Sequence, residues 1–293
     1  MEKDYLDGID VIYWINLDRA KDRHKYMTDL FKDKIFKNKK IIRKKAVDYT
    51  EKNLADMLVI SDLRQTEQEY SCLLSHLETI RLFSETNYKT ALILEDDISL
   101  DFKPYWVKTI QEVINGAPKD WDILKLYIKP HSINKYKKLY TLWNANPKVN
   151  YIGKKFENIS KKKIKQDDDG CIAYMINNKS AKKFIKNIYH NKKYVLADCI
   201  KIHISDYLIY KSLKTYVYKY PYFTFRKKNI SYIGQGDNAK WDNEISEQDY
   251  KIVKVLKSFK NKGTTRKHNK SSKYIKTRKH NKTHKNKTRK NKN

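Results

Sequence analysis

The chain has 293 residues, of which 40% are apolar and 13% aromatic. This is enough apolar material for one large hydrophobic core or two small ones, and it excludes a wholly disordered chain. The formal net charge is +30. Residues 262–293 contain 14 Lys or Arg and no acidic residue, so this segment exaggerates the basicity of the rest.

The N-terminal residues 1–10 are acidic and lack the charged-then-apolar order of a secretory signal. No stretch approaches the roughly 18 apolar residues of a membrane span. The cysteines, Cys72, Cys171 and Cys199, are too widely spaced for a zinc pattern, and no histidine pair has the spacing of a metal-binding helix. We therefore expect free thiols, a cytoplasmic location and no transmembrane segment.

The first elements alternate between strand and helix patterns. Residues 10–17 are a nearly continuous apolar run, which predicts a strand covered on both faces and hence a parallel sheet. Residues 18–31 then show helical spacing of apolar side chains, with Asp18 as the expected N-cap. Residues 40–47 predict a second strand.

The alternation continues along the chain. Thr66 and Glu69 form a capping-box pattern that opens a helix running to about residue 85. Later patterns predict strands at 88–94, 121–128, 171–176 and 215–220, and helices at 103–116, 178–189, 205–213 and 246–259. This order predicts an α/β fold with a mostly parallel central sheet flanked by helices.

The basic segment differs in character from the rest of the chain. The hexapeptide TRKHNK occurs at Thr265 and again at Thr277, among many Lys, Asn and Thr residues. Such a composition cannot bury enough surface to offset its ordering entropy, so we expect disorder and at most a non-specific contact with polyanions. The predicted organisation is a globular domain over 1–245, a helix over 246–260 and a disordered tail over 261–293.

Three adjacent carboxylates, Glu95 to Asp97, follow the apolar strand pattern at 88–94. The carboxyl ends of strands are where open α/β sheets bind ligands. Alternate residues of an extended segment share a side, so Glu95 and Asp97 are expected to converge while Asp96 points away. Two hard oxygen ligands suit Mn²⁺ or Mg²⁺. A solvated acidic turn is the alternative interpretation.

Five motifs together resemble glycosyltransferase family 25, which includes lipooligosaccharide sugar transferases and collagen galactosyltransferases. The motifs are INLDRAKDR from Ile15, CLLSH from Cys72, the EDD triplet, GCIAYMI from Gly170, and SDYLIY from Ser205. The resemblance covers residues 8–225. Ser71 and Cys171 depart from the Gly and Thr that the family often has at those positions, which leaves details of donor and acceptor binding open.

The resemblance implies a glycosyltransferase A-type fold, a nucleotide-sugar donor and usually a divalent metal. The matching positions then suggest two sets of residues. Metal binding is expected of Glu95 and Asp97. Donor binding is expected of the positions Asn16, Leu17, Arg19, Arg23, Ser75 and Asp96. Arg19 and Arg23 lie four apart on the expected first helix, so both can turn toward the nucleotide, or both can be ordinary surface charges.

The expected reaction moves a hexose, most simply from a UDP-linked donor, to a hydroxyl of a glycan or protein acceptor, with metal assistance and inversion. Inversion needs a base for the acceptor proton. Asp206 is the first candidate, Asp198 the second, and either can instead cap a helix. His76 is a third catalytic candidate that can orient donor or acceptor, or can simply be a packed core residue.

Alternatives remain for the metal, the function and the source. Asp167 to Asp169 form a second acidic triplet, but no apolar strand precedes it. A non-catalytic protein that binds polyanions through its basic tail is the alternative function, and a metal nuclease is a remote one. The excess of Lys, Asn, Ile and Tyr resembles coding by an A/T-rich genome, such as those of giant DNA viruses, which favours host cytoplasm or virion.

Overall fold

The computed structural model describes residues 3–60, 65–128, 151–153, 170–196 and 204–226, together with positions 253 and 257. The predicted disordered tail, the triplet Asp167 to Asp169 and Asp198 lie outside the described residues. So does nearly all of the predicted helix over 246–259 and both predicted domain boundaries near it. Within the described residues, no helix has the length and apolar character needed to cross a membrane.

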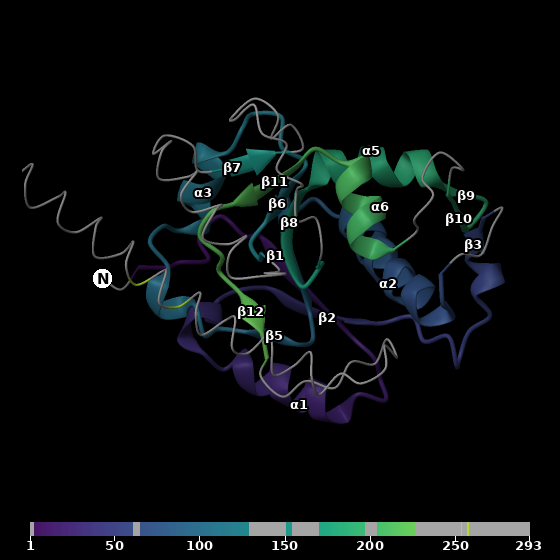
Figure 1. Cartoon of the computed structure of the whole chain (residues 1–293), viewed down its shortest axis with the longest axis horizontal. Helices are drawn as coiled ribbons and strands as arrows, with labels where there is room; N and C mark the ends of the chain where they lie inside the picture. The colour runs from purple at the N-terminus through teal and green to yellow at the C-terminus, as the bar shows by residue number, and fades with distance from the viewer. Residues whose placement is uncertain are drawn as a thin grey trace, which may run out of the picture.

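A seven-stranded sheet forms the centre of the described part of the chain, in the order β2-β1-β4-β8-β6-β11-β7 (Figure 1). Its strands are β1 Val11–Asn16, β2 Ile41–Lys45, β4 Thr90–Glu95, β6 Ile123–Lys125, β7 Tyr151–Gly153, β8 Ala173–Asn177 and β11 Thr215–Tyr218. Strands β2, β1, β4, β6 and β11 run in one direction, whereas β8 and β7 run against them. The prediction of an α/β fold with a mostly parallel sheet is confirmed.

Helices cover both faces of this sheet. They are α1 Lys21–Leu30, α2 Glu67–Ser84, α3 Ile110–Gly116, α5 Asn178–Ile188 and α6 Ser205–Ser212. Alternate residues of β1 enter different cores: Tyr13 packs in the core that α2, α5 and α6 cover, and Trp14 packs in the core that α1 and α3 cover. The continuous apolar run in β1 therefore reflects burial on both faces.

Short elements complete the described fold. Strands β3 Leu58–Val59, β10 Lys193–Val195 and β9 Tyr189–His190 form a small sheet, and β5 Ile98–Ser99 pairs with β12 Thr224–Phe225. Single 3₁₀ turns lie at Lys34–Phe36, Leu54–Asp56 and Lys103–Tyr105. The predicted helix over 103–116 is thus divided, because Thr109 and Glu112 form a capping box that starts α3 at Ile110, seven residues after the 3₁₀ turn begins.

Helix α2 matches its prediction closely, and helix α1 departs from its prediction at the N-terminus. The Thr66 hydroxyl accepts from the Glu69 backbone N–H, the Glu69 carboxylate accepts from the Thr66 N–H, and Glu85 is the C-cap. In contrast, α1 begins at Lys21 with Ala20 as its N-cap. Asp18 does not cap it, since its carboxylate accepts from Arg43 at 2.7 Å and is 2.7 Å from Lys45.

The parallel strands β2, β1 and β4 are neighbours and end at the same edge of the sheet, at Lys45, Asn16 and Glu95. The segments that follow them therefore meet at this edge. Helix α2 lies on the adjacent face and makes its own contacts with β1 and β2. This corner between the three strand ends and α2 contains most of the chemically active side chains that the sequence singled out.

Candidate active site

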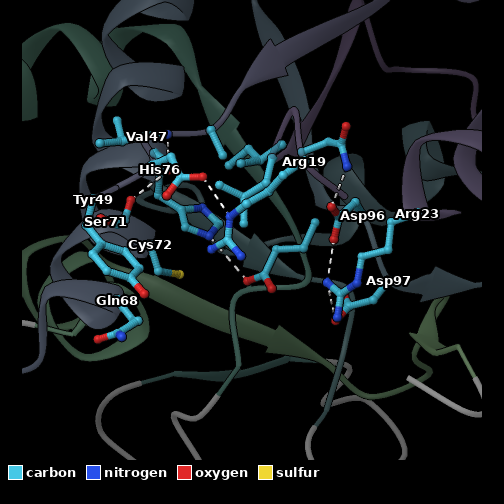
Figure 2. Close-up of a pocket in the computed structure, with 17 residues that line it drawn as sticks. Arg19, Arg23, Val47, Tyr49, Gln68, Ser71, Cys72, His76, Asp96 and Asp97 are labelled. Carbon is cyan, nitrogen blue, oxygen red and sulfur yellow. Dashed lines mark hydrogen bonds and ion pairs between the residues drawn. The ribbon is translucent and has the colours of Figure 1, made fainter. Parts of the chain in front are cut away.

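A cavity lies at this corner, between the ends of β1, β2 and β4 and the N-terminal half of α2 (Figure 2). It is lined by Ile15, Asn16, Leu17, Arg19, Arg23, Ala46, Val47, Asp48, Tyr49, Gln68, Ser71, Cys72, Ser75, His76, Glu95, Asp96 and Asp97. All six residues expected to bind a donor, both expected metal ligands and His76 are among them. The structure therefore brings together three of the five sequence motifs around one space.

Asp96 is the buried anchor of the acidic triplet. Its Oδ2 accepts from Asn16 Nδ2 at 2.6 Å and its Oδ1 accepts from Arg23 Nη1 at 2.6 Å. Burial raises the pKa of Asp96, and the hydrogen bonds from Arg23 and Asn16 oppose that effect. Asp96 points toward β1 and α1, where these partners hold it, and it lines the same cavity as Glu95 and Asp97.

Arg23 compensates the charge of the triplet. It lies in the first turn of α1, is only 8% exposed, and its Nη1 is 2.6 Å from Asp96 and 3.5 Å from Asp97 (Figure 2). Burial lowers the pKa of Arg23, but Asp97 and Asp96 outweigh it and raise the pKa above its usual value. A buried cation held by two carboxylates keeps this wall of the cavity in place.

Asn16 joins the triplet to β2. Its Oδ1 accepts from Arg43 Nε at 3.0 Å and from Arg43 Nη2 at 2.8 Å, while its Nδ2 donates to Asp96. Asn16 is 1% exposed, so both polar atoms of its side chain are committed to protein partners. Arg43, which the sequence analysis did not single out, thereby holds Asn16 in the orientation in which it donates to Asp96.

Arg19 lies on the exposed side of the cavity, in the turn before α1, so the expectation that it belongs to the first helix is wrong. Its Nε donates to Asp48 Oδ2 at 2.7 Å, and its side chain is 42% exposed. Asp48 is buried and also accepts from the Thr50 N–H and hydroxyl. Burial raises the pKa of Asp48, but the Arg19 and Thr50 hydrogen bonds outweigh it, so the pKa is lowered.

Glu95 and Asp97 line the same cavity but contact different walls. Glu95 Oε1 is 3.2 Å from His76 Nε2 on α2, whereas Asp97 Oδ2 is 3.5 Å from Arg23 Nη1 on α1. His76 is buried, and its Nδ1 is 3.1 Å from the Tyr174 hydroxyl. The two carboxylates therefore line the cavity with His76 beside Glu95 and Arg23 beside Asp97.

Ser75 attaches α2 to the segment after β2. Its Oγ accepts from the Val47 N–H at 2.8 Å and donates to the Ser71 carbonyl at 2.7 Å. Both contacts are buried, and they hold Val47 and the neighbouring Asp48 against the helix. Leu17 is partly exposed at the cavity, where it offers an apolar surface.

The model of glycosyltransferase family 25, described as an LPS biosynthesis protein, matches residues 9–201, which is more than half of the chain. The chain belongs to glycosyltransferase family 25. It is accordingly a glycosyltransferase, and the matched range includes every residue that lines the cavity.

Curated proteins and solved structures show less similarity to the chain than the family model does. No curated protein matches the chain. The crystal structure of mouse xyloside xylosyltransferase 1 in its apo form is similar, with a TM-score of 0.30 and 10% sequence identity over 61% of this chain. That match spans 60% of the mouse protein chain, so it reaches less than two thirds of it.

The candidate base of this family 25 chain lies next to the cavity without lining it in the described residues. Asp206 is in the first turn of α6, where its Oδ2 accepts from the Gly170 N–H at 2.7 Å and its Oδ1 accepts from the Tyr207 N–H at 2.9 Å. The preceding Ser205 reaches Cys72, with 3.6 Å between Oγ and Sγ. Asp198 lies outside the described residues.

Sequence reasoning did not name Asp48, Cys72, Tyr49 or Gln68 as site residues, although all four line the cavity. Asp48 had a usable signal, because it follows the predicted second strand and therefore had to reach the same sheet edge as Asn16 and Glu95. Cys72 also had one, since it lies four residues before the candidate His76 and residues four apart on a helix share a face. Tyr49 and Gln68 had none, because their positions depend on how the loop and helix meet.

The thiol of Cys72 has low reactivity. Burial raises the pKa of the Cys72 thiol well above its usual range, and the nearby Glu95 carboxylate raises it further. Without a bound cation, a thiol in such surroundings is protonated at neutral pH and is a poor nucleophile. We therefore assign Cys72 no covalent role in sugar transfer.

Proposed function

We propose that the chain transfers a hexose from a nucleotide-sugar donor, most simply a UDP-sugar, to a hydroxyl of a glycan or protein acceptor. The transfer is metal-assisted and inverts the anomeric carbon. One observation carries the proposal: four carboxylates, among them the Glu95 to Asp97 triplet, and two arginines line the same cavity at the carboxyl ends of β1, β2 and β4. Such strand ends are the usual ligand sites of α/β sheets.

The donor set of the triplet suits a hard divalent cation. Asp96 already accepts from Asn16 and Arg23, so Glu95 and Asp97 are the carboxylates that would hold Mn²⁺ or Mg²⁺. When bound, such a cation neutralises negative charge on the departing nucleotide diphosphate. Arg23 supports the same site by holding Asp96 and Asp97 at a fixed separation from α1.

Arg19 is the residue that we propose for the diphosphate of the donor. It lies at the exposed side of the cavity, and Asp48 holds its Nε so that the guanidinium keeps one orientation. A guanidinium matches the geometry of phosphate oxygens and stays charged throughout the reaction. Leu17 beside it offers an apolar contact for the nucleoside.

Arg19→Ala is expected to raise the donor KM by about 10- to 100-fold, because a hydrogen bond to a charged group contributes about 1.5–3 kcal/mol. Donor-dependence of initial rates measures this change. The matched control is Lys21→Ala, which removes the same charge from an exposed position two residues away. Equal effects of the two variants would reduce the role of Arg19 to general electrostatic attraction.

Asp206 is the proposed base, which takes the proton of the acceptor hydroxyl while the hydroxyl oxygen attacks the anomeric carbon and the diphosphate departs. The backbone N–H groups of Gly170 and Tyr207 orient its carboxylate. The contact of the preceding Ser205 with the cavity residue Cys72 supports a place for Asp206 near the cavity. Asp198 remains the second candidate.

Asp206→Asn is expected to lower transfer by about 10²- to 10⁴-fold, the usual contribution of general base catalysis, while donor binding is kept. Transfer to an acceptor and nucleotide binding by calorimetry are measured on the same preparation. If the variant instead unfolds at a lower temperature and loses both activities together, Asp206 only anchors Gly170 to α6.

A panel of UDP-sugars tests the proposed function. Donor hydrolysis is measured for each sugar with Mn²⁺ and again after addition of a chelator. Turnover of at least one hexose donor that stops with the chelator supports the proposal. No turnover with any donor would contradict it. A chain truncated at Lys262 should keep this turnover, whereas the alternative polyanion-binding function would be lost with the tail.

A further inference from the structure

We propose that Cys72, His76 and Glu95 form a binding site for a thiophilic divalent cation of the Zn²⁺ class on the α2 wall of the cavity. The three side chains come from two elements: Cys72 and His76 from α2 and Glu95 from the end of β4. One ligand atom of each, a sulfur, a ring nitrogen and a carboxylate oxygen, lies within 4.8 Å of the other two. The inference does not depend on the proposed function.

The arrangement follows from helix and strand geometry. Cys72 and His76 are four residues apart, so they lie on the same face of α2, and that face is turned to the end of β4. His76 Nε2 and Glu95 Oε1 are 3.2 Å apart. Two ligands of a tetrahedral Zn²⁺ with bonds of about 2.0 Å are separated by about 3.3 Å, so this pair is already at coordination distance.

The histidine ring has the outer support that metal-binding histidines usually have. Its Nδ1 is 3.1 Å from the Tyr174 hydroxyl, which leaves Nε2 directed at Glu95. Tyr174 is fully buried on β8, and its ring packs edge-on against Tyr210 at 6.0 Å. The core therefore fixes the orientation of the imidazole, with Nε2 as the atom available to a cation.

The donor set separates this site from the oxygen site proposed for Mn²⁺ or Mg²⁺. Sulfur and imidazole ligands favour Zn²⁺ and Co²⁺, whereas carboxylates alone favour the harder cations. Cys72, His76 and Glu95 all line the cavity, so a cation and a water ligand can enter from it. Because Glu95 would belong to both sites, Zn²⁺ at this site is expected to inhibit transfer, a consequence that does rest on the proposed function.

Cobalt binding tests the site without any donor or acceptor. The metal-free full-length chain is titrated with Co²⁺, and the near-ultraviolet absorption of a cobalt–thiolate bond is recorded. We expect this band in the wild type, its loss in Cys72→Ser, and its displacement by Zn²⁺ but not by an equal concentration of Mg²⁺. Cys171→Ser and Cys199→Ser are the matched controls, which should keep the band. A band that survives in Cys72→Ser, or none in the wild type, would overturn the proposal.

A second variant tests the geometry around the histidine. Tyr174→Phe keeps the buried ring but removes the hydroxyl near Nδ1, and loss of such outer support typically weakens metal affinity by about 10- to 100-fold. Circular dichroism checks that the fold is kept. Unchanged Co²⁺ affinity in a folded Tyr174→Phe chain would contradict the role given to His76. Failure of donor turnover would leave these binding results unaffected, so the two proposals are tested separately.

Discussion

Replacement of Asp97 by asparagine is expected to lower metal-dependent donor turnover by about 10²- to 10³-fold, a typical cost of removing one group that stabilises developing charge. Asp97 lines the cavity beside Glu95, and its Oδ2 is 3.5 Å from Arg23. The asparagine has nearly the same volume, so it removes a negative charge without opening a hole. The loss should appear in the rate at saturating donor and in a weaker response to added Mn²⁺.

The matched control for this variant is Asp101→Asn. Asp101 is an exposed carboxylate four residues further along the same segment, and it does not line the cavity. The Asp101→Asn substitution removes the same negative charge from the same part of the protein. Turnover within about twofold of wild type is expected for it. If Asp97→Asn also kept wild-type turnover and Mn²⁺ response, Asp97 would not be a metal ligand.

Arg23→Met is expected to lower the free energy of unfolding by about 3–5 kcal/mol, because it leaves the buried carboxylate of Asp96 without its cationic partner. The side chains of Arg23 and Asp96 are each 9% exposed and are 2.6 Å apart. Asp97 loses a neighbouring cation in the same change. Methionine keeps most of the apolar stem of the arginine, so the measured effect is mainly electrostatic. Urea unfolding at neutral pH gives the value.

Two comparisons make the Arg23 experiment specific. Lys25→Met removes an exposed cation that pairs with Asp29 on the same helix, and such exposed helical pairs contribute only about 0.3–0.5 kcal/mol. The double variant Arg23→Met with Asp96→Asn should be more stable than Arg23→Met alone, because it removes the buried charge left behind. A loss for Arg23→Met no larger than that for Lys25→Met would show that the buried pair does not hold the cavity wall.

The layered fold could be predicted from sequence because its strands are short apolar runs between helical patterns. Val11 to Asn16 illustrate this, since burial on both sheet faces leaves no polar alternation. The same property hid the direction of β8, because a strand buried on both faces reads alike whether it runs parallel or antiparallel to its neighbours. Its antiparallel pairing with β4 and β6 depends on contacts distant in sequence.

The candidate site could be predicted in outline but not in its internal contacts. The placement of Glu95 to Asp97 at a strand end required only the pattern of apolar residues. The partners of Asp18 and Arg19 were not predictable in the same way. Arg43 and Lys45 attract Asp18 away from the helix terminus, and Asp48 holds Arg19 in the turn before α1. Charge pairs formed across neighbouring strand ends therefore replaced the expected local cap.

The spacing of cysteines and histidines in the sequence did not indicate the proposed metal site. The separations among Cys72, Cys171 and Cys199 exclude a cysteine-based zinc motif, and no two histidines lie at metal-binding spacing. A mixed set of Cys72, His76 and Glu95 satisfies neither rule, because its third member comes from β4. Only the packing of α2 against the end of that strand brings the carboxylate to the helix.

The most direct test of the central claim, that this cavity binds the nucleotide-sugar donor with a cation, is a crystal structure with UDP and Mn²⁺ bound. Anomalous scattering locates the manganese independently of the nucleotide. We expect the diphosphate beside Arg19 and the manganese peak between the carboxylates of Glu95 and Asp97. UDP bound at another surface, or a manganese peak away from both carboxylates, would contradict the account.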